Sequence, residues 1–401
     1  MKNQLATLLM LATLNCQLLL VRAQGVLTPP GAPAPMMKSL DQIEARTAIT
    51  NTSSLVTISQ PGSYYLTHNL TVSSGDAIDI TTNDVTLDLN GFTIFSTAAS
   101  AAGTAINLNN PATNSDITIF NGHIKSGVTT NVDGVYTGSG FANGISYAGG
   151  APANVRVSGI SVMGVLTHGI NLWLGASTSA EACTVWTAGG YGVVATTIRA
   201  CLAIACGNTA IWGYQVTDSQ GQSASGFAGV SAEEAKNCYG SNGTSFGINS
   251  FIAQNCYGTS VNGQGINAVT ALNSYGSGGS PGGLYCTTAQ NCQGLSGSGI
   301  GLSATTAQNC YGSSYSSYGL NANTAQNCYG TSTTSIGLYA NMAQNCYGSG
   351  GTYGINAPFV ATSCYGYGTT NAGVLAFIAN SCHGGTSTGT ALNTTHNVNS
   401  Y

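Results

Sequence analysis

Hydrophobic and polar positions recur through the second half of the chain with a period of 18 residues. The words Lys-Asn-Cys-Tyr-Gly and Gln-Asn-Cys-Tyr-Gly mark this period. Ser219 and Ser274 take the place of cysteine twice, and one step has 19 residues. About twelve units result. We call these positions the cysteine column; its cysteines are Cys183, Cys201, Cys238, Cys256, Cys292, Cys310, Cys328, Cys346, Cys364 and Cys382.

Other columns keep the same period. An aliphatic residue after a glycine lies eight residues before the cysteine, as at Ile248, Leu302 and Leu338. An alanine lies three residues before it, as at Ala253 and Ala307. A self-similar unit of this length, broken by Gly and Asn, is typical of one coil of a solenoid. We expect these columns to point inward and to stack into one continuous core, with about 4.8 Å per coil.

The residue before the cysteine is asparagine in seven successive units. Asparagine tolerates the left-handed conformation that a sharp bend requires, and stacked amides hydrogen-bond along an axis. We therefore predict an asparagine ladder, formed by Asn237, Asn255, Asn273, Asn291, Asn309, Asn327 and Asn345.

Two other solenoid types are excluded. The calcium-binding nonapeptide repeat needs an Asp in each unit, and no Asp, Glu, Lys or Arg follows Lys236. A hexapeptide helix needs an aliphatic residue every six positions, which Leu320, Gln326 and Ser332 do not supply. We therefore predict an all-β fold, a single-stranded parallel β-helix (β-solenoid), with the regular 18-residue repeat array at residues 181–401.

The N-terminal half shows irregular strand-like segments with period-2 alternation, such as 77–80 and 85–89. We expect these segments to form irregular coils within residues 39–180. The sequence Ser39-Leu40-Asp41-Gln42 reads as a capping box. It predicts a short N-terminal capping helix through about Arg46, which would cover the open edge of the first coil.

A resemblance to a known family rests on three runs: Gly62 to Leu66, Asp76 to Ile80, and Val85 to Ile94, the last reading Val-Thr-Leu-Asp-Leu-Asn-Gly-Phe-Thr-Ile. Over residues 50–180 this pattern resembles the opening coils of the pectin-lyase-like superfamily. The resemblance implies a right-handed parallel β-helix. The family includes lyases, hydrolases, tailspike depolymerases and surface proteins, so the resemblance does not fix the chemistry.

The N-terminus predicts export. Lys2 precedes the apolar stretch 5–20, and small residues lead to a cleavage site near Ala23, so residues 1–23 read as a signal peptide. Residues 24–38 form a Pro-rich leader. No apolar run is long enough for a transmembrane segment. The expected localisation is secreted or cell surface.

Composition narrows the list of partners. Charged residues are 5% of the chain, and removal of Lys2 and Arg22 would leave six basic against twelve acidic residues. Without a basic cluster we expect no nucleic acid partner.

Catalysis would have to come from the N-terminal coils, where most of the acidic residues lie. The resemblance implies that lyases hold Ca²⁺ with acidic residues and that hydrolases use paired Asp residues. The weak catalytic candidates are Asp79, Asp88 and Asp116. No motif matches residue by residue. A polysaccharide lyase or glycoside hydrolase is therefore the alternative hypothesis, and Ca²⁺ belongs only to the lyase; otherwise no cofactor is expected.

The cysteine column admits two interpretations. A buried thiol ladder would pack as small hydrophobic groups, which fits the replacement by Ser274. Disulfides between adjacent coils are the alternative, since coil spacing suits the Cα separation but the parallel arrangement gives an unfavourable torsion. A metal site is not expected, because a line of ligands does not converge. The histidines His68, His123, His168, His383 and His396 also lack metal-ligand spacing.

A tyrosine follows the cysteine column in seven units. If the cysteines point inward, these tyrosines point outward and form a ladder, with either a stabilising or a ligand-binding role. The candidate ligand-binding residues are Tyr239, Tyr257, Tyr275, Tyr311, Tyr329, Tyr347 and Tyr365. We call them the tyrosine ladder.

The leading hypothesis is a non-catalytic extracellular β-helix that is structural, adhesive or glycan-binding, with a polysaccharide or cell-surface glycan as partner. End-to-end self-association is a further expectation, because no cap is evident after Ala391. Ice binding is a weaker idea, since no regular Thr-x-Thr column exists.

Overall fold

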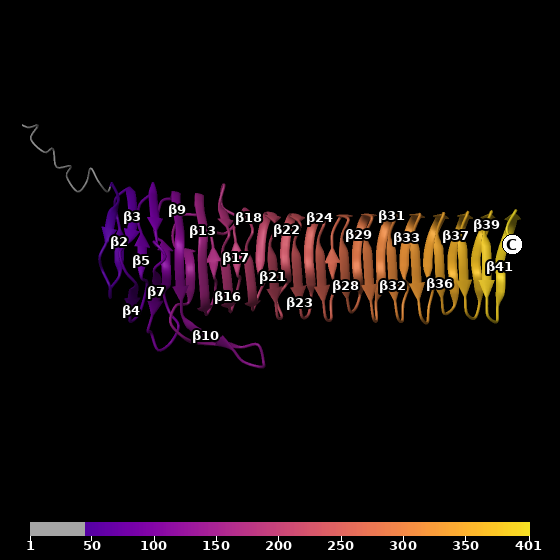
Figure 1. Cartoon of the computed structure of the whole chain (residues 1–401), viewed down its shortest axis with the longest axis horizontal. Helices are drawn as coiled ribbons and strands as arrows, with labels where there is room; N and C mark the ends of the chain where they lie inside the picture. Colours follow the sequence, from indigo (N-terminus) through magenta and orange to yellow (C-terminus); the bar gives the residue numbers. More distant parts are fainter. Residues whose placement is uncertain (1–44) are drawn as a thin grey trace, which may run out of the picture. The chain divides into compact units, whose positions relative to one another are not determined.

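The computed structural model describes residues 45–401, and Arg46–Tyr401 form one compact unit, a parallel β-solenoid of about 20 turns (Figure 1). Within the described residues 39 strands join into one sheet system, and a separate hairpin of two strands lies beside it. The expected signal peptide, the leader and nearly all of the capping helix lie outside the described residues. The described residues contain no helix, and none of them belongs to a segment that could span a membrane as a helix.

The coils before the array use strands of uneven length, from two to 14 residues, with loops between them. These strands are β1 (Thr47–Ile49), β2 (Val56–Ile58), β3 (Gly62–Leu66), β4 (Leu70–Val72), β5 (Ile78–Ile80), β6 (Val85–Asp88), β7 (Thr93–Ser96), β8 (Thr104–Leu108), β9 (Asn114–Lys125), β10 (Gly127–Thr130), β11 (Tyr136–Ser139), β12 (Asn143–Tyr147), β13 (Pro152–Val165), β14 (Ile170–Asn171) and β15 (Ser179–Glu181).

The array alternates a longer strand with a strand of about four residues once the period is established. Its strands are β16 (Thr184–Ala188), β17 (Val193–Val194), β18 (Thr197–Arg199), β19 (Leu202–Cys206), β20 (Ile211–Thr217), β21 (Gln220–Ser223), β22 (Ala228–Lys236), β23 (Tyr239–Asn242), β24 (Phe246–Gln254), β25 (Tyr257–Ser260), β26 (Ile266–Asn267), β27 (Thr270–Leu272), β28 (Tyr275–Gly278), β29 (Gly282–Gln290), β30 (Gln293–Ser296), β31 (Ile300–Gln308), β32 (Tyr311–Ser314), β33 (Leu320–Gln326), β34 (Tyr329–Ser332), β35 (Leu338–Gln344), β36 (Tyr347–Gly350), β37 (Tyr353–Thr362), β38 (Tyr365–Gly368), β39 (Ala372–Asn380), β40 (His383–Thr386) and β41 (Thr390–Val398).

Register in the array follows the sequence period. Leu302 of β31 pairs with Leu320 of β33, and Leu320 pairs with Leu338 of β35, so the aliphatic column stacks on itself. The alanine column stacks in the same way, with Ala307 opposite Ala325. The inward direction of both columns is confirmed, because these aliphatic and alanine side chains are buried.

Two glycine columns make the interior of the array unusually thin. An added Cβ on Gly312, in the Tyr-Gly column, would collide with the backbone carbonyl of Gly319 across the coil. An added Cβ on Gly319 would collide in turn with the backbone of Thr331. Backbone therefore packs directly on backbone at this end of the cross-section, and any side chain there would force the coil apart.

Every coil of the array turns in the same way before the cysteine column. The residue at this turn has a left-handed backbone, with φ between 48° and 54° from Asn237 to Ser381. The asparagine ladder is confirmed from Asn237 to Asn327: the Asn255 side-chain amide donates to the Asn237 side-chain oxygen at 3.1 Å. The same bond recurs four more times, from Asn273, Asn291, Asn309 and Asn327 to the preceding asparagine. Asn345 has the left-handed backbone but, among the described residues, makes no such bond.

One hairpin leaves the solenoid. Strands β10 and β11 pair antiparallel, and Figure 1 shows this segment extending beside the coils. The Tyr136 hydroxyl donates to the carbonyl of Ala205 at 3.0 Å, which fixes the hairpin on coils much later in the sequence. Gly189 and Gly207 give the Tyr136 side chain room, since a Cβ on either would meet it.

Candidate functional site

The tyrosine ladder forms as two runs of parallel rings on one side of the array. In the first run, Tyr239, Tyr257 and Tyr275 have ring centroids 5.5 and 4.6 Å apart. Gln293 interrupts the ladder by pairing with Tyr275 on one side and Tyr311 on the other. The second run, Tyr311, Tyr329, Tyr347, Tyr365 and His383, has successive centroids 4.6–5.3 Å apart.

Stacking determines which part of each ring a ligand could touch. Adjacent tyrosine planes differ by 8–17°, so each ring covers the face of its neighbour. The edges and hydroxyls stay open, and Tyr257 is 42% exposed. Sugar rings therefore cannot stack face-on along either run; they can meet tyrosine edges and hydroxyls. Burial, followed by the charge of neighbouring tyrosines, raises the pKa of Tyr257 and Tyr329, which keeps these hydroxyls protonated.

A shallow groove runs along the second run of the ladder. Its walls are the asparagine turn, as at Asn345, and the tyrosine ladder, as at Tyr347; the cysteine column lies along its floor. The groove crosses four coils and continues past Ser381 and His383 to Tyr401. We call this surface the axial groove. It offers amides, hydroxyls and ring edges without a single charged side chain, which is a surface suited to a neutral, hydroxyl-rich ligand.

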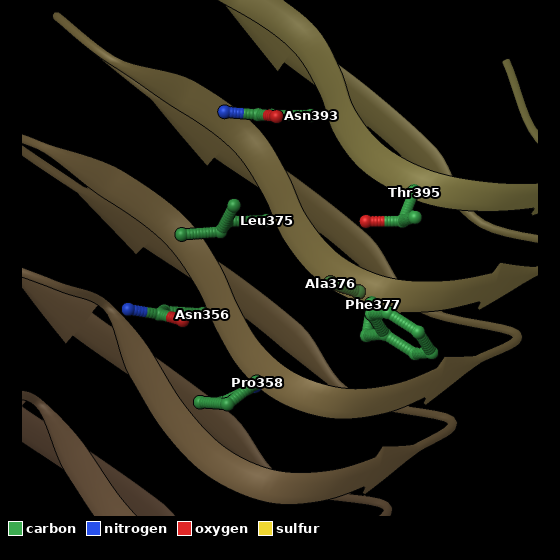
Figure 2. A pocket seen from close by; sticks show the side chains of 7 residues that line it. All are labelled: Asn356, Pro358, Leu375, Ala376, Phe377, Asn393 and Thr395. Carbon is green, nitrogen blue, oxygen red and sulfur yellow. The ribbon is translucent and has the colours of Figure 1, made fainter.

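A second hollow lies on the long strands at the end of the array. Figure 2 shows its lining: Asn356 and Pro358 on β37, Leu375 and Phe377 on β39, and Asn393 and Thr395 on β41. The side chains come from three successive coils and are again uncharged. Phe377 is 50% exposed at its rim.

An aromatic cluster that the sequence did not indicate lies where the array begins. Tyr191 stacks on His168 with centroids 5.3 Å apart and packs against Trp212 at 5.4 Å. Trp173 meets Trp212 edge-on at 5.1 Å and is 44% exposed. Trp173 also has a left-handed backbone, with φ of 50°, which is rare for a bulky residue.

The partly exposed indole of Trp173 makes the aromatic cluster a second candidate for ligand contact. Burial lowers the pKa of His168, whose Nδ1 accepts a hydrogen bond from the Tyr191 amide. The residues that touch are 23 (His168 and Tyr191), 21 (Tyr191 and Trp212) and 39 (Trp173 and Trp212) positions apart, so these contacts do not follow the 18-residue spacing. The scarcity of tryptophan, with three in the chain, was the one available signal.

The cysteine column is buried, as expected of an inward-facing position. Its ten cysteines have exposed fractions of 0–3%. Each is held by weak hydrogen bonds from sulfur to backbone carbonyls; for Cys256 these are the carbonyls of Ala235 and Gln254. Ser274 makes the equivalent bonds through its hydroxyl, which explains why serine replaces cysteine there.

The three weak catalytic candidates have separate partners. Asp88 is buried and forms an ion pair with Arg46 at 2.9 Å; it also accepts hydrogen bonds from Asn90 and Asn121. Asp116 accepts a bond from the Asn154 amide. Among residues 45–401 no hydrogen bond or ion pair links these carboxylates to one another. Asp88 thus holds a turn in place.

Asp79 has a different environment, because a second carboxylate lies beside it. Burial, followed by the charge of Asp76, raises the pKa of Asp79. One carboxylate oxygen of Asp79 is buried without a hydrogen-bond partner. Asp76 accepts bonds from the Thr104 amide and the Asn107 side chain. This pair was not identified from the sequence, where Asp76 was part of the fold pattern alone.

In the part of the chain that the structure describes, no group of three or more His, Cys, Asp and Glu side chains is placed to hold a metal ion. Comparison with known proteins adds no assignment to this geometry. No protein-family model, no curated protein and no solved structure shows a significant match to the chain.

Proposed function

We propose that this chain is an exported, non-catalytic β-solenoid that binds neutral glycans or serves as an adhesive surface through its uncharged side. The observation that carries the proposal is the axial groove. Neutral polysaccharides present many hydroxyls and no charge. A groove of amides, tyrosine hydroxyls and ring edges matches that chemistry, because these groups can exchange hydrogen bonds with the hydroxyls of a neutral ligand.

The repeat supports a polymeric ligand. Corresponding positions recur at every coil along the groove, with Asn or Ser at the turn and Tyr or His on the ladder, so a chain molecule lying parallel to the axis would meet similar contacts repeatedly. Weak contacts of this kind add when they act on one ligand. The aromatic cluster with its exposed Trp173 supplies what the tyrosine ladder lacks, a ring that stacked neighbours do not cover on both faces.

The handedness of the solenoid and the export of the chain belong to the same proposal. The resemblance of residues 50–180 to pectin-lyase-like proteins supports a right-handed solenoid, and the N-terminal pattern supports export to the surface or medium. End-to-end association also stays a prediction, and light scattering of the purified protein at increasing concentration tests it.

The glycan proposal is tested with the full chain on a panel of neutral and acidic polysaccharides. We expect binding to a neutral polymer and about tenfold weaker binding for Tyr347→Phe, which removes a hydroxyl but keeps the ring. Tyr339→Phe is the matched control, because Tyr339 stacks on Tyr318 in a different column. Equal effects of the two variants, or no binding to any neutral polymer, would contradict the proposal.

Trp173→Ala tests the contribution of the aromatic cluster in the same assay. Trp186→Ala is its control, since Trp186 is similarly exposed at 48% and lies outside the cluster. A loss specific to Trp173→Ala would place ligand contact at the cluster. Identical losses of binding would instead show that an exposed tryptophan contributes only non-specific hydrophobic binding.

One observation favours a second candidate, a polysaccharide hydrolase or lyase. The Asp76 and Asp79 carboxyls lie together, and the raised pKa of Asp79 is the condition that a general acid requires. If this candidate is right, Asp79→Asn abolishes polysaccharide cleavage while Asp133→Asn, on the exposed hairpin, leaves it intact. Cleavage that survives Asp79→Asn would exclude this pair as the catalytic site.

A further inference from the structure

The order of cysteine and serine in the cysteine column shows a regularity that packing alone does not require. Ser219, Ser274 and Ser400 divide the column, and the cysteines between them form uninterrupted runs of two, two and six. Register places these residues directly above one another, as the pairing of Gln220 with Tyr239 shows for the neighbouring position. Every run therefore has an even number of members.

Each run also ends on a serine in the same way. The amide of Cys201 donates to the hydroxyl of Ser219 at 3.1 Å, and the amide of Cys256 donates to that of Ser274 at 3.1 Å. The amide of Cys382 donates to the hydroxyl of Ser400 at 2.9 Å. In the coil that follows each run, a serine hydroxyl thus occupies the position of the sulfur. A hydroxyl cannot form a disulfide.

Within a run, cysteines of adjacent coils lie one above the other, because the tyrosines that follow them pair in register, as Tyr239 does with Tyr257. A hydrogen bond between the thiols of Cys238 and Cys256, followed by burial, raises the pKa of Cys238. The same kind of interaction links every neighbouring pair of the run of six, from Cys292 to Cys382, so the pairing within that run follows from its even number of members. The cysteine lies after the left-handed turn and before the next strand, as Cys256 does between β24 and β25, so the fixed side-chain direction of a strand does not constrain it. Coil spacing of about 4.8 Å falls within the Cα separation of disulfides.

From this arrangement we infer that the cysteine column is a set of five disulfide staples, each joining one coil to the next. Because every run has an even number of cysteines, each column cysteine has a partner of its own, and the serines separate one run from the next. The pairs are Cys183–Cys201, Cys238–Cys256, Cys292–Cys310, Cys328–Cys346 and Cys364–Cys382. Cys206 and Cys286 lie outside the column and stay reduced; burial raises the pKa of Cys206 to about 12.

The chemistry is thiol–disulfide exchange with a small-molecule disulfide such as glutathione disulfide as the oxidant. One column thiolate attacks the external disulfide, forms a mixed disulfide and releases one thiol. The neighbouring column thiolate then displaces the second thiol and closes the S–S bond. Two column thiols lose two electrons and two protons, and one external disulfide becomes two thiols. Since the folded column is buried, exchange takes place while coils are being added.

The test counts free thiols by position. The full chain is refolded in a glutathione redox buffer, denatured, alkylated without reduction and mapped by peptide mass spectrometry. Over residues 45–401 we expect alkylation of Cys206 and Cys286 alone, with crosslinked peptides from residues 18 apart. Alkylation of all ten column cysteines would overturn the inference and establish a thiol ladder.

Variants test the parity directly. Ser274→Cys joins two runs into one of nine, so one column thiol should become free; adding Ser219→Cys gives an unbroken run of twelve, and that thiol should disappear. Cys310→Ser isolates Cys292, which should be the one column cysteine newly alkylated. If each added cysteine simply adds one alkylated thiol, neighbouring cysteines do not pair and the inference is wrong.

Discussion

In the coils before residue 181, large aliphatic side chains such as Leu87, Ile106 and Ile119 fill each turn completely. From β22 onward in the array, about one fully buried aliphatic side chain per coil suffices, as at Leu320, and glycine, alanine and cysteine supply the rest of the interior. The first kind of interior tolerates loops, a hairpin and charged side chains. The second is narrow and repeats itself, and it leaves variation to the outer surface.

The difference teaches where each kind of function can reside. Asp76, Asp79, Asp88 and Asp116 all belong to the irregular coils, where unequal turns bring unlike side chains together. The array gives each coil the same neighbours, so it builds rows rather than convergent sites. Catalysis needs convergence, whereas binding to a polymer can use a row.

The largest effect should come from filling the thin interior of the array. Gly312→Ala places a Cβ against the backbone of Gly319, so the two sides of the coil must separate; we expect a loss of about 3 kcal/mol or more in unfolding free energy. Urea denaturation followed by circular dichroism measures it. Gly297→Ala is the control, because nothing lies within 4 Å of its added Cβ. Similar losses for both would show that the glycine columns have no packing role.

A smaller effect should come from the polar anchor of the irregular coils. Asp88→Ala leaves Arg46 without this carboxylate and removes acceptors from Asn90 and Asn121, and we expect a loss of about 1–3 kcal/mol. Hydrogen exchange of the first coils reports the loss locally. Asp133→Ala, in the exposed hairpin, should leave exchange unchanged. Normal protection in Asp88→Ala would contradict the anchoring role.

The left-handed turn before the cysteine column is occupied by asparagine in one coil, at Asn309, and by alanine in another, at Ala200. Each residue can therefore be replaced by the other type. Asn309→Ala puts alanine in a left-handed turn and removes two ladder bonds, which should cost about 1–2 kcal/mol. Ala200, at the equivalent turn, already has φ of 51°. Ala200→Asn should therefore stabilise the protein by about 1 kcal/mol. Thermal unfolding measures both, and opposite signs are required.

The smallest effect concerns pH. Since the pKa of Asp79 is raised above 3.8, the fold favours its protonated form. Its contribution to stability is present below pH 3.8 and is lost as the pH rises through the folded pKa. Asp79→Asn removes that loss, so the variant should be more stable than the parent at pH 7, by about 1 kcal/mol or less, with the gap closing near pH 3. A gap that widens on acidification would reverse the sign and refute this interpretation.

The array could be predicted from the sequence because one period controls packing, register and turns at once. The inward columns, the asparagine ladder and the row of tyrosines all follow from spacing. The stacked orientation of the rings does not, since spacing places Tyr329 next to Tyr347 without fixing the plane of either. That plane decides whether a ligand meets faces or edges.

Less of the structure of the irregular coils could be predicted from the sequence. Their strands could be located from alternation, but the meeting of Trp173, Tyr191 and Trp212 depends on loop lengths that carry no period. The contact between Tyr136 and Ala205 spans 69 residues of sequence and likewise has no local signal. The proximity of Asp76 to Asp79 depends on side-chain direction at a loop-to-strand junction, which alternation alone leaves open.

The self-pairing of the array columns, in which Leu320 stacks on Leu338 as Leu302 stacks on Leu320, has a consequence for the size of the molecule. Because consecutive coils present matching interfaces, duplication or loss of whole repeats in the gene, two at a time within a cysteine run, would join surfaces that already fit and keep the cysteines paired. Reach could then change by about 4.8 Å per coil with no new interface to be evolved. Length is thus a heritable variable, tunable independently of what the outer surface recognises.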